Sequence, residues 1–265
     1  MVLTFLAAGS GISEFFKGSI VREMFPRIVT EGIRNTLLYA AIAFVGGLII
    51  GLLLALARIS KRRAFRWTAA TIVDVVRGLP ALLTIILIGY GLPIAYKSLT
   101  GGRWRWPFGE LGSKFIPGGF ALSIVAGAYL AESIRAGIEA IPKGQMEAAR
   151  SLGMPHGLAM RKVILPQAFR IIIPPLTNEL TALLKDTSLI AILGVQVGGR
   201  EILQYARTHT NARSNTTPLV VGGLAYLVIT IPLLRLVALL ERRAKGGGGS
   251  SVRLRLRPRH DGSKA

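Results

Sequence analysis

One apolar stretch of the chain is interrupted by side chains that can bind charged groups. Residues 170–197 carry Asn178 and Glu179 and, two helical turns further on, Lys185 and Asp186. A carboxylate beside an amide can hold an ammonium or a cationic side chain, and a lysine can meet a carboxylate. Because charged groups inside an apolar segment are costly, they usually face protein or water. These four residues therefore predict a polar, water-filled path for a small charged solute.

Glu179 is the residue whose role is least explained by its neighbours. In a helical segment 170–197, it lies about 13 Å along the axis, near the middle of a bilayer. Thr177 and Asn178 stand beside it, and no opposite charge precedes it within helical reach. A substrate contact is one interpretation. An ion pair with a basic residue on another segment is the alternative.

Other residues in apolar segments predict structural contacts. Asp74 and Arg77, and likewise Glu132 and Arg135, are three residues apart, so each pair can form an ion pair on one helical face. A gating role is the alternative for these pairs. The string Gly47-x-x-x-Gly51 predicts close packing between helices within the chain, with a dimer face as the alternative.

The composition indicates a membrane protein and excludes several kinds of site. The 265 residues are 51% hydrophobic with a mean hydropathy of +0.50, and 33 Lys+Arg against 13 Asp+Glu give a net charge of +20. A nucleic-acid-binding protein shares the charge but not the apolar fraction. The absence of cysteine excludes a disulfide scaffold and a cysteine nucleophile, and three scattered histidines predict no metal site. No G-x-x-x-x-G-K-[ST] string occurs, so ATP-driven work requires a partner.

The segments that must position these residues are predicted to be five transmembrane helices. Their ranges are roughly 35–57, 68–96 (most apolar at 79–96), 118–141, 170–197 and 217–240. Hydropathy supports 170–197 poorly, but charge requires it. The stretches 58–67 and 142–170 and the tail from 241 hold 18 of the 33 basic residues, which places them in the cytoplasm. An N-terminus outside and a C-terminus inside need an odd number of crossings.

The two ends of the chain are predicted to lie outside the permeation domain, which spans 31–241. Residues 1–30 contain too short an apolar run for a signal peptide. Ile12, Phe16, Ile20, Met24 and Ile28 instead share one helical face, which predicts an interfacial helix kinked at Pro26 or a helix packed against the first span. Residues 242–265 form a Gly-rich linker and a basic tail, predicted to be disordered and held to anionic lipid, with an engineered addition as the alternative.

The connection 142–168 has the features of a docking segment. Two short helices are predicted in it, with Gly153 between them. Met146, Ala149 and Leu152 give the first helix an apolar stripe at i, i+3 and i+6. Helices this short are unstable alone in water, so they need something to dock on. A short helix with one apolar face fits a groove on a soluble partner.

Several strings together resemble a known family. Glu147-Ala148-Ala149, then Gly153, then Val163 followed by Leu165-Pro166, resemble the loop signature of ABC-transporter permeases of the importer class. The strings at 77–80 (RGLP), 91–93 (GLP), 128–135 (AYLAESIR) and 183–189 (LLKDTSL) are similar to those of polar amino-acid permeases. The resemblance covers roughly 30–240. Val163 replaces the more usual Ile, and Leu79 replaces the more usual Thr.

The resemblance implies an all-α integral membrane protein of the type I importer permease fold, with about five transmembrane helices and a short cytoplasmic coupling-helix loop. It implies two ATP-binding subunits inside, a second permease copy or a sister permease, and an extracytoplasmic substrate-binding protein. ATP and Mg would bind the partner subunits, so no cofactor is expected on this chain. The residues implied in ATPase coupling are Glu147, Ala148, Ala149, Leu152, Gly153, Val163, Leu165 and Pro166. The other interpretation of the first of these is a surface ion pair between Glu147 and Arg150.

The function expected from these features is import of a polar amino acid by alternating access. The same machinery carrying an opine, a cystine-like solute or a small peptide is the nearest alternative. A membrane enzyme using Glu179 and Asp186 is a second class, but it lacks a nucleophile and leaves the docking loop unexplained. A membrane scaffold or sensor that recruits an ATPase without transport is the third.

Overall fold

The structure, a computed structural model, describes residues 17–99, 101, 109–195 and 197–246. Helices joined by short turns account for almost all of them, with no strand in these ranges, which confirms the all-α prediction. The linker and tail were predicted to begin at residue 242, but the last helix continues through Gly246; residues 247–265 and the first 16 residues lie outside the described part. The elements in chain order are α3 (Gly18–Arg27), η1 (Ile28–Ile33), α4 (Arg34–Arg58), α5 (Arg63–Gly78), α6 (Ala81–Ile86), η2 (Leu87–Gly91), α7 (Leu92–Leu99), α8 (Gly109–Glu139), α9 (Lys143–Ser151), α10 (His156–Ala159), η3 (Met160–Ile164), α11 (Leu165–Asp186), η4 (Thr187–Leu193), α12 (Ile202–Arg213) and α13 (Thr217–Gly246).

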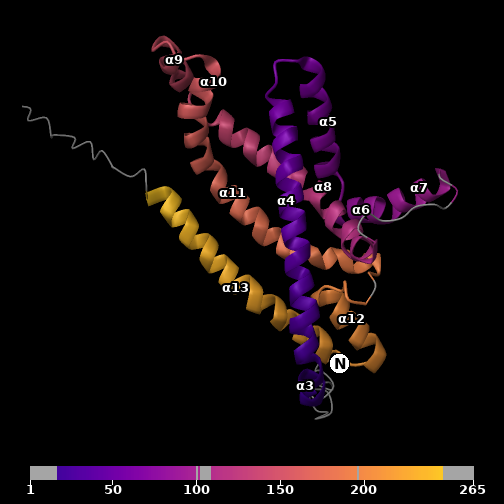
Figure 1. Cartoon of the computed structure of the whole chain (residues 1–265). Coiled ribbons are helices and arrows are strands. Elements are labelled where there is room, and N and C mark those ends of the chain that lie inside the picture. Colours follow the sequence, from indigo (N-terminus) through magenta and orange to yellow (C-terminus); the bar gives the residue numbers. More distant parts are fainter. Residues whose placement is uncertain (1–16, 100, 102–108, 196, 247–265) are drawn as a thin grey trace, which may run out of the picture.

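Four helical runs in the described residues are long and apolar enough to cross a bilayer: Gly18–Arg58, Ala81–Leu99, Phe115–Glu139 and Thr217–Leu239. Helix α11 is also 22 residues long, but the polar residues near its end lower its hydropathy. It packs against α8, α13 and α4, as Figure 1 shows, and so lies among the spanning helices. The arrangement therefore agrees with a crossing by segment 170–197, which the charge distribution requires.

The N-terminal segment differs from a separate interfacial helix. Helix α3 continues through a π-helical turn directly into α4, with Pro26 inside the helical run. Its apolar face, formed by Ile20, Met24 and Ile28, is buried against α12 and α13 rather than against the first span. The four-residue spacing read from the sequence is thus that of a face that packs on protein.

The second predicted span, 68–96, is broken near its middle. Helix α5 ends at Gly78, and Leu79 and Pro80 are extended, with ψ of 144° and 132°. A proline disfavours helical geometry in the residue before it, which explains why the break falls at Leu79. A new helix then begins at Ala81. The two halves can therefore change their mutual angle without breaking a continuous helix.

Small residues allow α4 and α8 to pack closely. A Cβ added at Gly47 would lie 2.8 Å from the Cβ of Ala126, and one added at Gly51 would lie 2.9 Å from the Cβ of Leu130. From the opposite side, a Cβ at Gly127 would lie 2.6 Å from a methyl group of Ile50. The glycine string thus serves packing within the chain, as small residues do where membrane helices approach closely.

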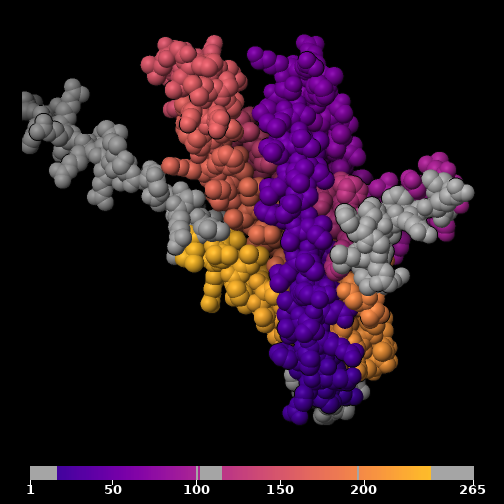
Figure 2. All heavy atoms as spheres, viewed as in Figure 1, coloured from indigo at the N-terminus to yellow at the C-terminus, as the bar shows by residue number. Residues whose placement is uncertain are grey.

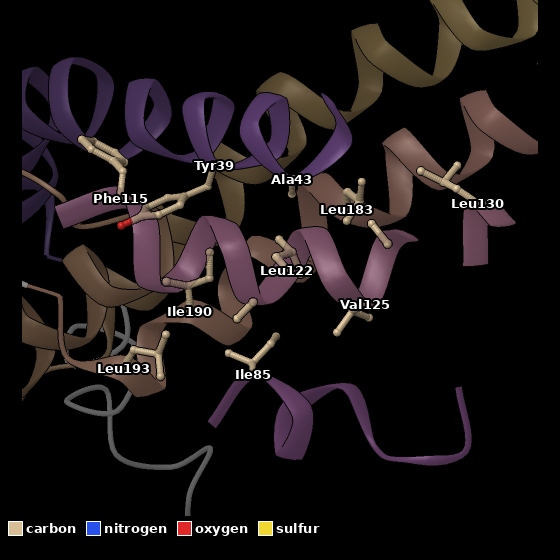
Figure 3. Close-up of a cluster of buried hydrophobic side chains, with 12 residues drawn as sticks. Tyr39, Ala43, Ile85, Phe115, Leu122, Val125, Leu130, Leu183, Ile190 and Leu193 are labelled. Carbon is tan, nitrogen blue, oxygen red and sulfur yellow. The ribbon is translucent and has the colours of Figure 1, made fainter. Parts of the chain in front are cut away.

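The central hydrophobic cluster joins α4, α8, α11, η4 and α6 (Figure 3). Tyr39 of α4 and Phe115 of α8 pack with ring centroids 5.1 Å apart. Ile85, from the helix that follows the break, is fully buried in the same cluster. The first half of the broken span, α5, therefore lies outside this cluster, whereas its continuation α6 contributes to it.

The two ends of the molecule carry different elements. The turn between α4 and α5 lies at the same end as α9 and α10, whereas α3 and α12 lie at the other end (Figure 1). In Figure 2 the α4–α5 end and the α9–α10 segment stand out as two separate projections. Both basic connections, 58–67 and 142–170, are thus at one end, which is the arrangement that a common cytoplasmic location requires.

Polar contacts fix the segment before α12 at the opposite end. Asn35 Nδ2 donates to the carbonyl oxygens of Gly198 and Arg200, both at 3.0 Å, and the Ile202 N–H donates to Thr36 Oγ1 at 3.2 Å. The buried Glu201 carboxylate caps α12 by accepting the N–H groups of Leu203 and Gln204. It also accepts the hydroxyl of Tyr226 at 2.7 Å, so one carboxylate ties α12 to α13.

Gly51→Ala should destabilise the protein by about 1–3 kcal/mol, because the new methyl group meets the Leu130 side chain and nearby α8 backbone at about 3.0 Å or less. The thermal midpoint of the purified protein in detergent measures this. Gly223→Ala in α13 is the matched control, since nothing lies within 4 Å of the added Cβ. Equal midpoints for the two variants would contradict the packing argument.

The cap at Glu201 predicts a pH dependence. Burial raises the pKa of this carboxyl above its usual range, despite the hydrogen bonds that oppose the change. The folded state therefore binds the proton more tightly than the unfolded state, so wild-type stability should fall as pH rises through the raised pKa. Thermal midpoints at about pH 5 and about pH 8 test this, and Glu201→Gln should remove this part of the dependence. An unchanged dependence in the Gln variant would assign it to another group.

Candidate functional site

The helix predicted to dock on a partner has a well-defined end. Helix α9 begins after Pro142 and ends in a Schellman motif, in which the Met154 N–H donates to Ala149 O at 3.1 Å and the Gly153 N–H donates to Arg150 O at 3.0 Å. Gly153 has φ of +82°, a conformation that L side chains rarely adopt. This position therefore requires glycine for its backbone rather than for space, since a Cβ there would meet no atom within 4 Å.

Helix α9 turns one face inward and leaves the other open. Ala149 is buried and Met146 packs against the cluster formed by α4, α8 and α11. Leu152, predicted to share that stripe, is instead 82% exposed. Glu147 and Ala148 are exposed as well. The face available to a partner is thus apolar at its end and mixed along its length.

The second part of the loop connects this helix to α11. Val163 lies half-buried in the π-helical turn η3 and packs on the same cluster as Met146. Leu165 and the exposed Pro166 begin α11, which continues directly from η3. Gln167 Nε2 donates to Val163 O at 2.9 Å and to Gln145 Oε1 at 3.4 Å, which ties α9 to the start of α11. These hydrogen bonds hold α9 beside the start of α11.

The surface ion pair between Glu147 and Arg150 is absent from the described residues. Arg150 Nη1 instead donates to Met154 O at 3.0 Å, across the end of the helix. Glu147 accepts only through its backbone, from Ser151 Oγ at 3.0 Å. No partner of its carboxylate is found among the residues that the structure describes.

The four residues predicted to line a path share one face of α11. Asn178 and Lys185, and likewise Glu179 and Asp186, are seven residues apart, so all four lie within about 120° around the helix. Asn178 and Lys185 are exposed, whereas Glu179 and Asp186 are half-buried. The structure brings the four together as a polar strip about two turns long.

Glu179 pairs with no basic residue among those that the structure describes. In the part of the chain that the structure describes, neither an ion pair nor a hydrogen bond of its carboxylate is found. The threonines beside it bond instead to the helix backbone: Thr177 Oγ1 donates to Pro174 O at 2.8 Å and Thr181 Oγ1 donates to Thr177 O at 3.1 Å. A carboxylate without a partner at membrane depth needs water, a ligand or another chain.

Of the two ion pairs predicted from three-residue spacing, one is confirmed and the other is wrong. Glu132 pairs with Arg135, as the spacing indicates. Arg77, however, lies with Nη1 3.9 Å from Glu132 Oε2 and with its guanidinium 5.3 Å from the Tyr129 ring centroid, and it does not pair with Asp74 in the described residues. The reason is that α5 packs against α8, which offers a carboxylate and an aromatic face.

Two residues that make polar contacts between helices were not predicted from the sequence. Arg58, counted only as a topological charge, makes an ion pair with Glu132. Its position at the end of a long apolar run was the available signal. Glu201 gave no recognisable signal, because glutamate is not a preferred N-cap residue. No cluster of metal-binding side chains is found in the ranges described.

Known proteins of similar sequence and structure indicate the family of this chain. Residues 47–246 match the family of binding-protein-dependent transport system inner membrane components. A probable glutamine ABC transporter permease of Bacillus subtilis is 38% identical over 218 residues, covering 80% of this chain and 91% of that protein. An arginine transport system permease of the same organism is 36% identical over 217 residues, covering 82% and 92%.

A solved structure, described as an amino acid ABC transporter with histidines, is 32% identical and has a TM-score of 0.73. The match covers 86% of this chain and 99% of that chain. The structural similarity and the sequence matches agree with one another. This chain belongs to the family of inner-membrane permease components of binding-protein-dependent ABC transporters, among the amino-acid permeases.

Proposed function

We propose that this chain carries a polar amino acid into the cytoplasm by alternating access, driven by two partner ATP-binding subunits. The observation that carries the proposal is α9, a short helix with an exposed apolar end at Leu152, held out at the basic end of the molecule. Such a helix can seat in a groove of a soluble subunit. Because the chain has no phosphate-binding loop, ATP and Mg would bind those subunits.

The strip on α11 supports a path for an amino acid. Glu179 offers a carboxylate for an ammonium or a cationic side chain, and Lys185, about 9 Å further along the axis, offers an ammonium for a carboxylate. Relatives named for glutamine, arginine and L-cystine differ in side chain but share the α-ammonium and α-carboxylate. The strip would therefore recognise what these solutes have in common.

The exposed strip also supports the remaining partners. A polar face cannot remain against lipid, so a second permease copy or a sister permease would cover it and form the other half of the path. The basic end would lie in the cytoplasm, with the C-terminus inside, and α3 and α12 would lie outside, where an extracytoplasmic substrate-binding protein can dock.

Reconstitution of the complete complex tests this function. Proteoliposomes containing this permease, its ATP-binding subunits and its binding protein should accumulate a polar amino acid only when ATP is supplied. Complex formation without uptake would favour the scaffold alternative. Uptake of only an opine or a peptide would favour the other substrate classes.

Gly153→Ala should weaken coupling, because the left-handed conformation that ends α9 costs an alanine roughly 1 kcal/mol or more. We expect a lower yield of ATP-binding subunit on co-purification and a lower uptake rate. Gly157→Ala, in the same loop but without a positive φ, is the matched control and should behave like wild type. Wild-type coupling in both variants would remove α9 from the docking site.

Glu179→Gln should raise the KM for uptake about tenfold or more, because it removes the carboxylate that meets the substrate cation. ATP hydrolysis without substrate should stay unchanged, since the residue lies far along α11 from the loop. Glu139→Gln, at an exposed position on α8, serves as the control. Uptake with an unchanged KM would exclude a substrate contact for Glu179.

A further inference from the structure

The ionic contacts around Glu132 link three helices at the inner half of the molecule. Its carboxylate accepts Arg58 of α4 and Arg135 of α8, and Arg77 of α5 approaches to 3.9 Å. Arg135 also pairs with Glu139 at the end of α8. The side chains of Arg58, Glu132 and Arg135 are 16%, 27% and 25% exposed, so these contacts are partly shielded from solvent. One carboxylate therefore serves three guanidinium groups from three helices.

This cluster is connected directly to the docking loop. Helix α8 ends at Glu139, and only residues 140–142 separate it from α9. Ile141, in that short connection, is buried in a cluster that includes Ala55 of α4 and Ile134 of α8. Any displacement of α9 must therefore move the end of α8 that carries the ionic cluster.

The cluster is not needed to hold α4 on α8. The glycine contacts around Gly47, Gly51 and Gly127 already bring these two helices together. Arg77 is different, because it is near the end of α5, just before the break at Leu79 and Pro80. Beyond the break, Ile85 is anchored in the central core, whereas α5 itself is not. The contact of Arg77 with Glu132 and the Tyr129 ring thus adds to the burial of Ala69 and Val73 in holding α5, which packs on α4 and α8.

We propose that Glu132 is a positioning residue that makes α4, α5 and α8 move as one unit, so that displacement of the docking loop is passed to the break in the second span. The inference rests on the proposed function, because it assigns the part that carries ATP-driven movement into the membrane. The angle between α5 and α6 then changes at Leu79 and Pro80, whereas the ionic contacts of Glu132 keep α4, α5 and α8 in fixed relative positions.

Glu132→Gln tests the inference in the reconstituted complex. The variant should assemble and hydrolyse ATP, but amino acid imported per ATP hydrolysed should fall about tenfold, which is the size of a typical coupling between sites. Glu139→Gln, which removes only the outer partner of Arg135, should keep the wild-type ratio within about twofold. A wild-type ratio in an assembled Glu132→Gln complex would overturn the proposal.

A covalent replacement distinguishes a stiff joint from a gate and from a purely structural contact. The chain has no native cysteine, so Arg77→Cys with Glu132→Cys gives a single reactive pair. Without a cross-link this complex should show the lowered ratio, and a short bifunctional thiol reagent should restore it. Loss of the remaining uptake on cross-linking would mean that the contact between α5 and α8 must open during transport. A wild-type ratio both without and with the cross-link would mean that the contact is only structural. Either result contradicts the proposed role of Glu132.

The wild-type complex, measured in parallel, separates this inference from the proposed function. Absence of ATP-driven uptake by the wild type contradicts the proposed function and, with it, the proposed role of Glu132. Wild-type uptake together with an unaltered ratio in the variants contradicts the proposed role of Glu132 alone.

Discussion

The close approach of α4 and α8 is the contact on which the other features depend. Glycines at Gly47, Gly51 and Gly127 remove the side chains that would otherwise separate the two backbones. In a bilayer, lipid is as apolar as the helices, so association relies on such close van der Waals contact rather than on the hydrophobic effect. The contact fixes α4 along its length. It thereby places Arg58 beside Glu132 at one end and the polar residues that bind the α12 segment at the other.

Two surfaces of the single chain are left incomplete, and each has the chemistry of a different partner. The docking loop exposes Leu152 and Glu147 at the basic end. The strip on α11 exposes Asn178 and Lys185 at a depth where lipid would otherwise lie. The first surface suits a soluble subunit, and the second suits water, solute and a second permease. The described chain is thus one part of a larger assembly.

The sequence was informative where local chemistry decides the structure. The short helix α9, its end at Gly153 and the Glu132–Arg135 pair could be predicted from residue types and helical spacing. The glycine contacts of α4 were predicted as internal packing, although their partner on α8 was not identified.

The features that could not be predicted depend on which helices become neighbours. Arg77 contacts Glu132 and the Tyr129 ring rather than Asp74, which is nearer in the sequence, because α5 packs against α8. The apolar face that begins on α3 likewise packs against α12 and α13, which are distant in the sequence. Hydropathy also misjudged α11, whose polar residues lower its mean hydropathy although it packs among the spanning helices. Pairing between distant segments is not recorded in the spacing of either one.

The central claim is that the strip on α11 lines an aqueous path in the assembled transporter, and thiol labelling tests it most directly. The chain contains no cysteine, so single cysteines at Asn178, Ala182 and Lys185 can be compared with one at the exposed, apolar Val228 of α13. The account predicts that a hydrophilic thiol reagent labels the α11 positions in the membrane complex, that substrate protects them, and that Val228→Cys stays unreactive. Unreactive α11 cysteines, or labelling that substrate does not change, would contradict it.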